Sequence, residues 1–352
     1  MARLVEVPAE GTDAFVDALR RAWDAGDAVL PLDPRLPAPA AAAVRRALRP
    51  GDEVEDGDAL VVATSGTTGD PKGVVLTHSA VAASAWAVSG RLGVDPASDR
   101  WLACLPLSHV GGLGVVARAL LTGTPLTVLP RPDPVLVAAA GATRTSLVAT
   151  ALKRLDVSSF RTVVLGGDAP PTGLPANVVT TYGMTETGSG IVYDGVPLDG
   201  VSVRAVDGEL HVRGPMLLRA YRDGVDPKDA DGWLATGDAG SVAPDGTVSV
   251  DGRMGDVIVT GGEKVWPLPV EAVLREVAGV AEVAVVGRPD AEWGSRVVAV
   301  VVPADAAAPP ELELLRAAVK ERLAAFAAPR ELVLVESLPR TALGKVRRAN
   351  VR

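Results

Sequence analysis

The stretch Thr64-Ser65-Gly66-Thr67-Thr68-Gly69-Asp70-Pro71-Lys72-Gly73 carries more chemical information than any other part of this chain. Its three glycines let the backbone turn and bring N–H groups close to an anion. Its four hydroxyl groups and one ammonium group add further hydrogen-bond donors at the same place. This composition is typical of a loop that holds the phosphates of a nucleotide.

The residues around this loop predict its shape. A P-loop needs Gly-Lys-Ser/Thr at the start of a helix, whereas Lys72 follows Pro71 and precedes an apolar, strand-like run over 74–76. Another apolar run, 59–63, comes before the loop. We therefore expect a strand-loop-strand hairpin. Taken alone, the glycine and threonine content also suits an ordinary surface loop.

Length and composition restrict the class of protein. A chain of 352 residues is long enough for two unequal domains. The net charge of -8 and the pI near 5.1 argue against nucleic acid as the main partner. Residues 1–23 lack a secretory signal pattern, no apolar run is long enough for a membrane span, and the single cysteine, Cys104, lies in an apolar run. We expect a cytoplasmic protein.

Strand-like and helical segments alternate in the first half of the chain. This alternation predicts an α/β domain with a largely parallel sheet. The predicted helices are 13–23, 38–48 and 79–91, and the predicted strands after the loop are 101–105, 126–129, 146–149, 162–165 and 178–181.

The pattern changes twice after residue 196. Asp-Gly pairs at 207–208, 231–232, 245–246 and 251–252 predict the hairpins of a small β-subdomain. Beyond Arg253 the order is helix 268–277, strands 282–287 and 296–302, helix 311–325 and strand 331–335, which predicts an α+β unit. We expect an N-terminal domain over 1–252, a hinge at 253–256 and a C-terminal domain over 257–352.

Two segments follow predicted strands at the edge of the sheet where ligands collect. Gly166-Gly167-Asp168 would let a flat ring approach the backbone, although an ordinary turn has the same composition. The segment 182–188 supplies an aromatic ring, two hydroxyl groups and the carboxylate of Glu186. Because Mg²⁺ takes oxygen ligands, often one carboxylate plus substrate phosphates, Glu186 is the candidate metal ligand.

Six segments, in this order, resemble the motifs of the adenylate-forming superfamily of acyl-CoA synthetases, luciferases and peptide-synthetase adenylation domains. The resemblance covers nearly the whole chain. It implies a large N-terminal α/β domain with a β-subdomain and a small mobile C-terminal α+β domain. The matching segments are the phosphate loop with Lys72-Gly73, Leu105-Pro106-Leu107-Ser108-His109, Tyr182 to Glu186, Thr236-Gly237-Asp238, Gly252-Arg253 with Asp256, and Pro339-Arg340-Thr341 through Gly344-Lys345.

The resemblance implies an ATP site and a catalytic group. Thr185 would contact the α-phosphate, and Asp238 would accept hydrogen bonds from the ribose hydroxyls, as a carboxylate can. The implied catalytic residues are Lys345, Thr185, Glu186 and His109. The residues implied to bind ATP or AMP are Thr64, Ser65, Gly66, Thr67, Thr68, Gly69, Lys72, Gly166, Gly167, Asp168, Tyr182, Gly183, Met184, Thr185, Asp238 and Arg253.

Lys345 would bridge the substrate carboxylate and the α-phosphate, where a placed ammonium stabilises charge as it develops. The implied reaction forms an acyl-adenylate and pyrophosphate, and the thiol of coenzyme A then attacks the acyl-adenylate. The C-terminal domain would rotate between these steps about Gly255, where the family usually has Asp or Lys. Gly261 and Gly262 would lie near the pantetheine tunnel. Without the resemblance, the basic residues near Lys345 suit a solvated tail.

The early position of the phosphate loop, and the segment 181–201, are similar to the compact o-succinylbenzoate-CoA ligases of menaquinone biosynthesis, in their actinobacterial form. Such a substrate has two carboxylates, so the acyl pocket should hold a cation or several donors beside an apolar wall. His109 and Gly188 are the residues implied at this pocket. Arg144 is the candidate for the second carboxylate, and its replacement by alanine should then affect a diacid more than a monoacid.

Other classes remain open at this point. Other aromatic or fatty acyl-CoA synthetases share the motifs, whereas an amino-acid adenylation domain would need an Asp near His109 and 107–109 offers none. A nucleotide-binding module without activity would leave Lys345 unexplained. The expected partners are the small molecules o-succinylbenzoate, ATP, Mg²⁺ and coenzyme A, with no nucleic acid and no membrane span, and a homodimer is left open.

Overall fold

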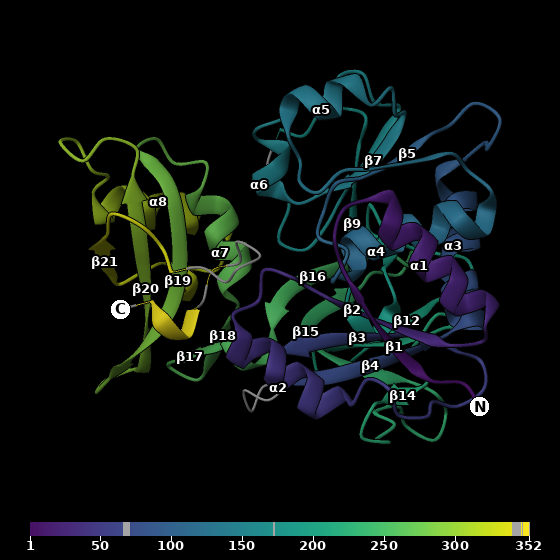
Figure 1. Cartoon of the computed structure of the whole chain (residues 1–352). Coiled ribbons are helices and arrows are strands. Elements are labelled where there is room, and N and C mark those ends of the chain that lie inside the picture. The colour runs from purple at the N-terminus through teal and green to yellow at the C-terminus, as the bar shows by residue number, and fades with distance from the viewer. Residues whose placement is uncertain (66–70, 172, 340–345, 347, 352) are drawn as a thin grey trace.

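The computed structural model describes residues 1–65, 71–171, 173–339, 346 and 348–351. Figure 1 shows a larger body formed by the chain up to β16 (Val248–Arg253) and a smaller one formed by the C-terminal strands and helices. In the described part of the chain, the larger body holds three sheets and the smaller body one. No described helix is long and apolar enough to cross a membrane.

The first sheet carries the phosphate-loop hairpin. Its order is β1-β2-β3-β4-β14, with β1, β2 and β3 parallel and β3 antiparallel to β4. The strand-loop-strand prediction is therefore confirmed. The elements are β1 (Leu4–Pro8), α1 (Asp13–Asp24), β2 (Ala28–Leu32), α2 (Ala38–Leu48), β3 (Asp58–Ser65), β4 (Pro71–Thr77) and β14 (Ala220–Tyr221).

The second sheet is the predicted parallel one, with the order β11-β10-β9-β8-β7-β5-β6 and parallel pairing from β9 to β6. Its elements are α3 (His78–Leu92), β5 (Trp101–Ala103), α4 (Val110–Thr122), β6 (Leu126–Val128), α5 (Pro134–Ala139), β7 (Arg144–Leu147), α6 (Ala149–Leu152), β8 (Thr162–Leu165), β9 (Val178–Gly183), η1 (Thr185–Thr187), β10 (Gly190–Tyr193) and β11 (Val196–Pro197).

One strand of this sheet lies earlier than predicted. The expected strand 146–149 is β7, Arg144–Leu147, and Ala149 begins α6. Pairing with β5 and β8 extends β7 to Arg144, because a buried position between two strands supplies hydrogen bonds that local propensity does not report. Arg144 is therefore at the amino end of a central strand.

The third sheet is the predicted β-subdomain, formed by β12 (Ser202–Val206), β13 (Glu209–Arg213), β15 (Leu234–Val242) and β16 in that order. Asp207 and Gly208 both have positive φ, 51° and 85°, as the tight turn between β12 and β13 requires. The pair at 245–246 lies between β15 and β16. The expected turn at 251–252 is wrong, since both residues belong to β16.

The C-terminal sheet has the order β18-β17-β20-β19, with β21 paired to β20. Two apolar clusters pack on its faces, one under α7 and α8 and one beneath the C-terminal segment. The division at 253–256 stays a prediction, although η2 separates β16 from this sheet. The elements are η2 (Met254–Asp256), β17 (Ile258–Thr260), β18 (Glu263–Val265), α7 (Pro267–Leu274), β19 (Val280–Asp290), β20 (Gly294–Pro303), α8 (Leu312–Arg322), η3 (Ala325–Ala327), β21 (Glu331–Leu334) and η4 (Arg348–Asn350).

Candidate active site

Lys72, Tyr221 and Glu186 meet where three elements converge. The ammonium of Lys72 on β4 lies 5.1 Å from the centroid of the Tyr221 ring. Tyr221 belongs to β14, which pairs with β4, and its hydroxyl donates to Oε1 of Glu186 at 3.0 Å. Burial, followed by the charge of Glu186, raises the pKa of Tyr221 to about 12, so the phenol stays protonated and donates. One tyrosine thus links the lysine of the phosphate loop to the predicted metal ligand.

The sequence reasoning missed Tyr221. It lies in a two-residue strand without a motif of its own, and only the pairing of β14 with β4 brings it to the site. The rarity of tyrosine was the one signal in the sequence, because the chain has three tyrosines in 352 residues. The other two, Tyr182 and Tyr193, lie on neighbouring strands β9 and β10.

A second group joins Tyr182, Asp238 and Arg253. The Tyr182 hydroxyl donates to Oδ2 of Asp238 at 2.8 Å, and Nε of Arg253 lies 3.1 Å from Oδ1. The antiparallel register of β15 and β16 sets Arg253 opposite Asp238. Burial first, and then the charge of Asp238, raises the pKa of Tyr182 above its usual range. The structure therefore brings together three residues predicted from separate motifs.

The turn after β9 places Thr185 and Glu186. Met184 N donates to Oγ1 of Thr187 at 2.9 Å, which closes the single turn of η1, and Gly188 ends it with a φ of 68°. A Cβ at Gly183 would lie 2.2 Å from the carbonyl oxygen of Ser189, so only glycine fits between β9 and β10 at this point.

The loop after β8 lies beside this turn because β8 pairs with β9. A Cβ at Gly166 would come within 2.9 Å of Cγ2 of Thr181, and Gly167 has a φ of 93°. The carboxylate of Asp168 accepts from Ala169 N at 2.8 Å. Close packing on Thr181 thus requires glycine at position 166, and the positive φ favours it at position 167, while a contact of this loop with a flat ring stays a prediction.

His109 is the N-terminal capping residue of α4, at the edge of the second sheet. Hydrogen bonding from Arg35 holds the pKa of Asp33 below its usual range, and the nearby charge of His109 acts in the same direction. His109 thus lies near the end of β2. On the other side, Gly114 of α4 faces Ser189, with its virtual Cβ 3.4 Å from Oγ.

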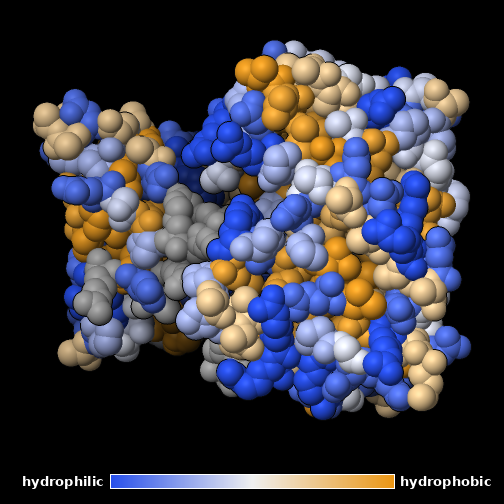
Figure 2. Space-filling model, viewed as in Figure 1, coloured by the Kyte–Doolittle hydropathy of each residue, from blue (hydrophilic) through white to orange (hydrophobic). Residues whose placement is uncertain are grey.

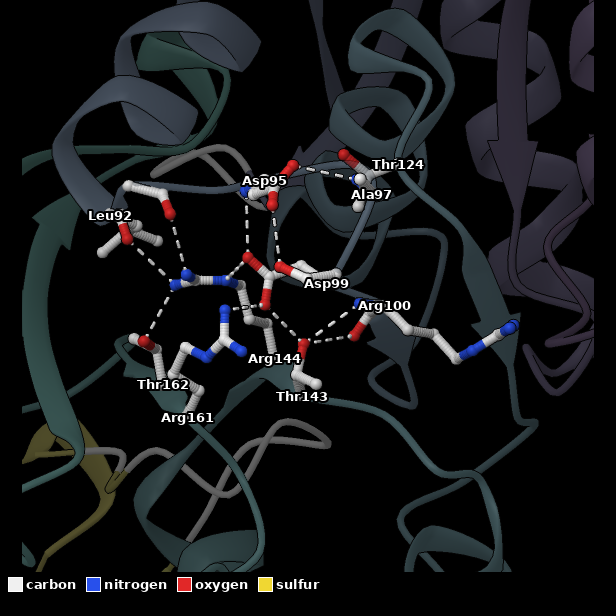
Figure 3. Close-up of polar contacts among 12 residues, drawn as sticks. Leu92, Asp95, Ala97, Asp99, Arg100, Thr124, Thr143, Arg144, Arg161 and Thr162 are labelled. Carbon is white, nitrogen blue, oxygen red and sulfur yellow. Dashed lines mark hydrogen bonds and ion pairs between the residues drawn. The ribbon is translucent and has the colours of Figure 1, made fainter.

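The expectation that Arg144 binds a substrate carboxylate is corrected by its surroundings, shown in Figure 3. Its Nε lies 2.9 Å from Oδ2 of Asp99, and both side chains are buried, with 2% and 0% exposed. Its other nitrogens donate to the carbonyls of Leu92 and Gly93 and to Thr162. Ligands collect at the carboxyl ends of parallel strands, whereas Arg144 starts its strand.

Replacing Arg144 by methionine is expected to lower the free energy of unfolding by about 3 kcal/mol, because it leaves Asp99 buried without its main cation. The ratio of KM between a dicarboxylate and a monocarboxylate substrate should stay that of the wild type. Urea unfolding and steady-state kinetics measure the two effects. A selective rise in KM for the dicarboxylate would restore the original assignment.

Arg118 is the buried cation that the sequence reasoning missed. It is 2% exposed, its Cζ lies 4.8 Å from the centroid of the Trp101 ring, and its Nη2 donates to Oγ of Ser189 at 3.4 Å. Its Nε and Nη1 have no hydrogen-bond partner within the described part of the chain. Tyr193 lies close enough to act on its pKa, which burial lowers. A buried guanidinium with two free donors is costly unless an acceptor joins it.

Arg118 lies on α4, the helix that follows the capping residue His109, one turn beyond Gly114. Residues four apart on a helix share a face. Gly114 and Arg118 therefore both face Ser189, next to Gly188, the residue predicted at the acyl pocket. The signal in the sequence was an arginine within an otherwise apolar helix, 110–122.

The glycines predicted at the hinge and at the pantetheine tunnel differ in their surroundings. Gly261 and Gly262 form the turn between β17 and β18, with φ of 59° and 87°. A Cβ at Gly261 would lie 2.7 Å from the Trp293 ring, so this turn packs closely on the indole. Gly255 lies in η2, where a Cβ would meet nothing within 4 Å. Figure 2 shows the surface hollowed between the two bodies.

Several predicted residues lie outside the described residues, namely Gly66, Thr67, Thr68, Gly69 and Lys345. The backbone of Ser65 ends β3, and Oγ1 of Thr64 donates to the carbonyl of Lys72 at 3.5 Å. Both therefore belong to the hairpin that carries the loop.

The donor set suits Mg²⁺ bound with phosphates. In the described ranges, no group of three or more histidine, cysteine, aspartate or glutamate side chains could hold a metal ion by itself. Glu186 supplies one carboxylate whose orientation Tyr221 sets. Mg²⁺ typically takes one or two carboxylates, with substrate phosphates and waters completing its shell. The residues fit this group.

Two family profiles match the chain. The profile of the AMP-binding enzyme family matches residues 30–222, and that of the AMP-binding enzyme C-terminal domain matches residues 269–345. A probable 2-succinylbenzoate–CoA ligase of Mycobacterium tuberculosis is 40% identical over 377 residues, covering 99% of this chain and 97% of that protein. A 2-succinylbenzoate–CoA ligase of Bacillus cytotoxicus is 36% identical, covering 83% of this chain and 69% of that protein.

Solved structures agree with these relatives. The o-succinylbenzoate CoA synthetase (MenE) from Bacillus subtilis, in complex with the acyl-adenylate intermediate OSB-AMP, has a TM-score of 0.85 at 27% identity, covering 99% of this chain and 88% of that one. The same synthetase in complex with ATP and magnesium ion has a TM-score of 0.85 at 26% identity, covering 99% and 89%. The predicted adenylate-forming fold is confirmed. This chain belongs to the AMP-binding enzyme family.

Proposed function

We propose that this chain is an ATP-dependent 2-succinylbenzoate–CoA ligase that acts in menaquinone biosynthesis in the cytoplasm. The observation that carries the proposal is the 40% identity to such a ligase along nearly the full length of both proteins. The grouping of Tyr182, Asp238 and Arg253 at a prospective ribose site supports it. Relatives of known structure bind OSB-AMP, AMP, or ATP with magnesium.

The first half-reaction joins the substrate carboxylate to the α-phosphorus of ATP, and the bond to pyrophosphate breaks. Lys72 and the loop 64–69 hold the β- and γ-phosphates, and Thr185 contacts the α-phosphate. Mg²⁺, when bound by Glu186, neutralises charge on the phosphates of the leaving group. Lys345 stabilises the charge that develops between carboxylate and phosphorus.

The second half-reaction forms the thioester. The thiol of coenzyme A attacks the acyl carbon, its proton is lost, and AMP leaves with the bonding electron pair. Gly261 and Gly262 border the route of the pantetheine arm, and Gly255 is the point about which the smaller body turns. The open surroundings of Gly255 permit a large backbone change.

Arg118 takes the place of Arg144 as the cation for the second carboxylate. Its Nε and Nη1 have no partner in the described residues, so the guanidinium keeps charged donors for a carboxylate that the substrate brings. The Ser189 hydroxyl and the Tyr193 phenol lie beside it and offer further polar contact. Trp101 supplies an apolar wall behind the guanidinium. A diacid would thus offset the cost of burying Arg118.

The test is thioester formation by the purified chain with ATP, Mg²⁺ and coenzyme A across a panel of carboxylates. We expect o-succinylbenzoate to be used with the highest kcat/KM, ahead of benzoate, fatty acids and amino acids. Liquid chromatography with mass detection identifies each CoA ester. No ester with o-succinylbenzoate, or transfer to a carrier protein in place of coenzyme A, would reject the proposal.

Replacing Tyr221 by phenylalanine is expected to raise the Mg²⁺ concentration for half-maximal activity by about tenfold, because Glu186 loses the partner that orients it. The phenyl ring still faces Lys72, so KM for ATP should change little. Tyr221→Leu removes the ring as well and should raise both quantities. Titrations of Mg²⁺ and ATP separate the two contacts. If Tyr221→Phe and Tyr221→Leu had the same KM for ATP, the contact of the Tyr221 ring with Lys72 would contribute nothing to ATP binding.

A further inference from the structure

The chain ends in a segment that is held against the smaller body at several points. Arg348 of η4 donates from Nη2 to both carboxylate oxygens of Glu271, at 2.8 Å and 2.9 Å. Its Nη1 donates to Oδ2 of Asp256 at 3.2 Å. Glu271 lies on α7 and Asp256 ends η2, so one guanidinium connects the C-terminal segment to a helix and to the hinge region.

Apolar contacts hold the same segment on either side of this arginine. Val346 and Val351 pack against a cluster on the C-terminal sheet that includes Val298, Val300 and Leu338. Lys345 directly precedes Val346 in the chain. Arg348 follows Lys345 by three positions in the chain, so the contacts that fix Arg348 act close to the lysine in sequence.

Glu271 needs the cation that Arg348 brings. Its side chain is 2% exposed, and burial raises its pKa, which the charge of Arg348 opposes. Val285 N donates to Oε1 at 2.9 Å, and Arg275, one turn further along α7, donates to Oε2 at 3.1 Å. Among the residues that the structure describes, the buried carboxylate thus pairs with two cations, and Arg348 is the one from the C-terminal segment.

A charge of the larger body also acts on the anchored arginine. Burial lowers the pKa of the Arg348 guanidinium, whereas the charges of Glu271, Asp256 and Asp168 raise it. The net effect is a raised pKa. Asp168 lies in the loop after β8, the loop predicted to frame the adenine. The cation at position 348 is therefore within electrostatic range of the nucleotide side of the molecule.

We propose that Arg348 is a positioning residue for Lys345: by pairing with Glu271 and Asp256 it holds the segment that delivers the lysine to the reacting carboxylate and α-phosphate. This inference rests on the proposed function. Adenylation requires the ammonium at one place, and a misplacement of about 1 Å can cost on the order of 100-fold in rate. In this role Arg348 acts through Lys345 and binds neither ATP nor the acid.

The experiment compares Arg348→Gln with Arg275→Gln, which removes the other cation from the same carboxylate. Carboxylate-dependent exchange of pyrophosphate into ATP reports adenylation, and CoA ester formation from supplied acyl-adenylate reports the second half-reaction. We expect Arg348→Gln to slow exchange by about 10- to 100-fold, with a much smaller effect on thioester formation. Arg275→Gln should leave both rates near those of the wild type.

A second comparison shows whether Arg348 acts through Lys345. In the Lys345→Ala background, Arg348→Gln should add no further loss of exchange, since the group that it positions is absent. Arg348→Lys, which keeps a charge but not the paired contacts, should give an intermediate rate and serves if the glutamine variant does not fold. Thermal unfolding checks the fold of each variant.

Three results would overturn the inference: equal losses in both half-reactions, the same loss in Arg275→Gln, or additive losses in the double variant. Each would assign Arg348 to the stability of the smaller body alone. Failure of the proposed function is distinguished by the wild type, which would then show no exchange with any carboxylate of the panel.

Discussion

Replacing Lys345 by alanine is expected to slow carboxylate-dependent exchange of pyrophosphate into ATP by about 10²–10³-fold. The reason is that attack of a carboxylate on phosphorus spreads negative charge over the oxygens around the new bond. An ammonium placed there stabilises this charge in the transition state more than in the ground state. The KM for ATP should change far less than kcat, since the proposed mechanism assigns the other phosphates to Lys72 and the loop 64–69.

Lys320→Ala is the matched control, because Lys320 is an exposed lysine on α8 of the same body. It should exchange pyrophosphate at the rate of the wild type. Thioester formation from supplied acyl-adenylate should survive in Lys345→Ala, since that step forms no bond to phosphorus. An undiminished exchange rate in Lys345→Ala would sink the adenylation mechanism for this chain.

Replacing Arg118 by methionine is expected to lower kcat/KM for o-succinylbenzoate by about 100-fold, in line with the loss of a buried partner for a carboxylate. The value for benzoate should change little, because a monoacid has no second carboxylate to pair. Methionine has a similar length and removes a guanidinium whose Nε and Nη1 have no partner in the described residues. The variant without substrate should therefore unfold at a temperature no lower than the wild type.

Measuring both kcat/KM and the unfolding temperature distinguishes a role in substrate binding from a role in protein stability. A structural arginine such as Arg144 should lose stability when replaced and keep its selectivity, whereas Arg118 should do the reverse. Arg118→Lys keeps the charge but not the paired donors, and should recover part of the selectivity. Equal losses of kcat/KM for the diacid and the monoacid would contradict the role of Arg118.

Local patterns predicted much of the fold. The hairpin that carries the phosphate loop, the helix at 38–48 and the strand at 162–165 lie where the residues indicated. These are cases in which apolar periodicity and turn chemistry agree with the tertiary packing. The turn expected at 251–252 failed because an Asp-Gly pair can also continue a strand when its partner, β15, supplies the hydrogen bonds.

The roles of buried arginines were harder to predict from the sequence than the other parts of the candidate site. Arg118 lies between two alanines in the sequence and Arg144 between two threonines, yet both are 2% exposed. The difference is in their partners: Asp99, 45 positions earlier in the chain, neutralises Arg144, whereas Arg118 on α4 donates to the uncharged Ser189, 71 positions later. No local pattern reports a partner so distant in sequence.

By itself, the sequence determined the family, the order of the motifs and the two-body α/β architecture, because these depend on residue types at short spacing. Only the tertiary structure decided which side chains meet. Strand pairing places Tyr221 between Lys72 and Glu186, and a buried ion pair removes Arg144 from the site. The packing of α4 beside Ser189 and the pairing of Arg348 with Glu271 are likewise long-range contacts, whose energies arise from burial that the local sequence does not contain.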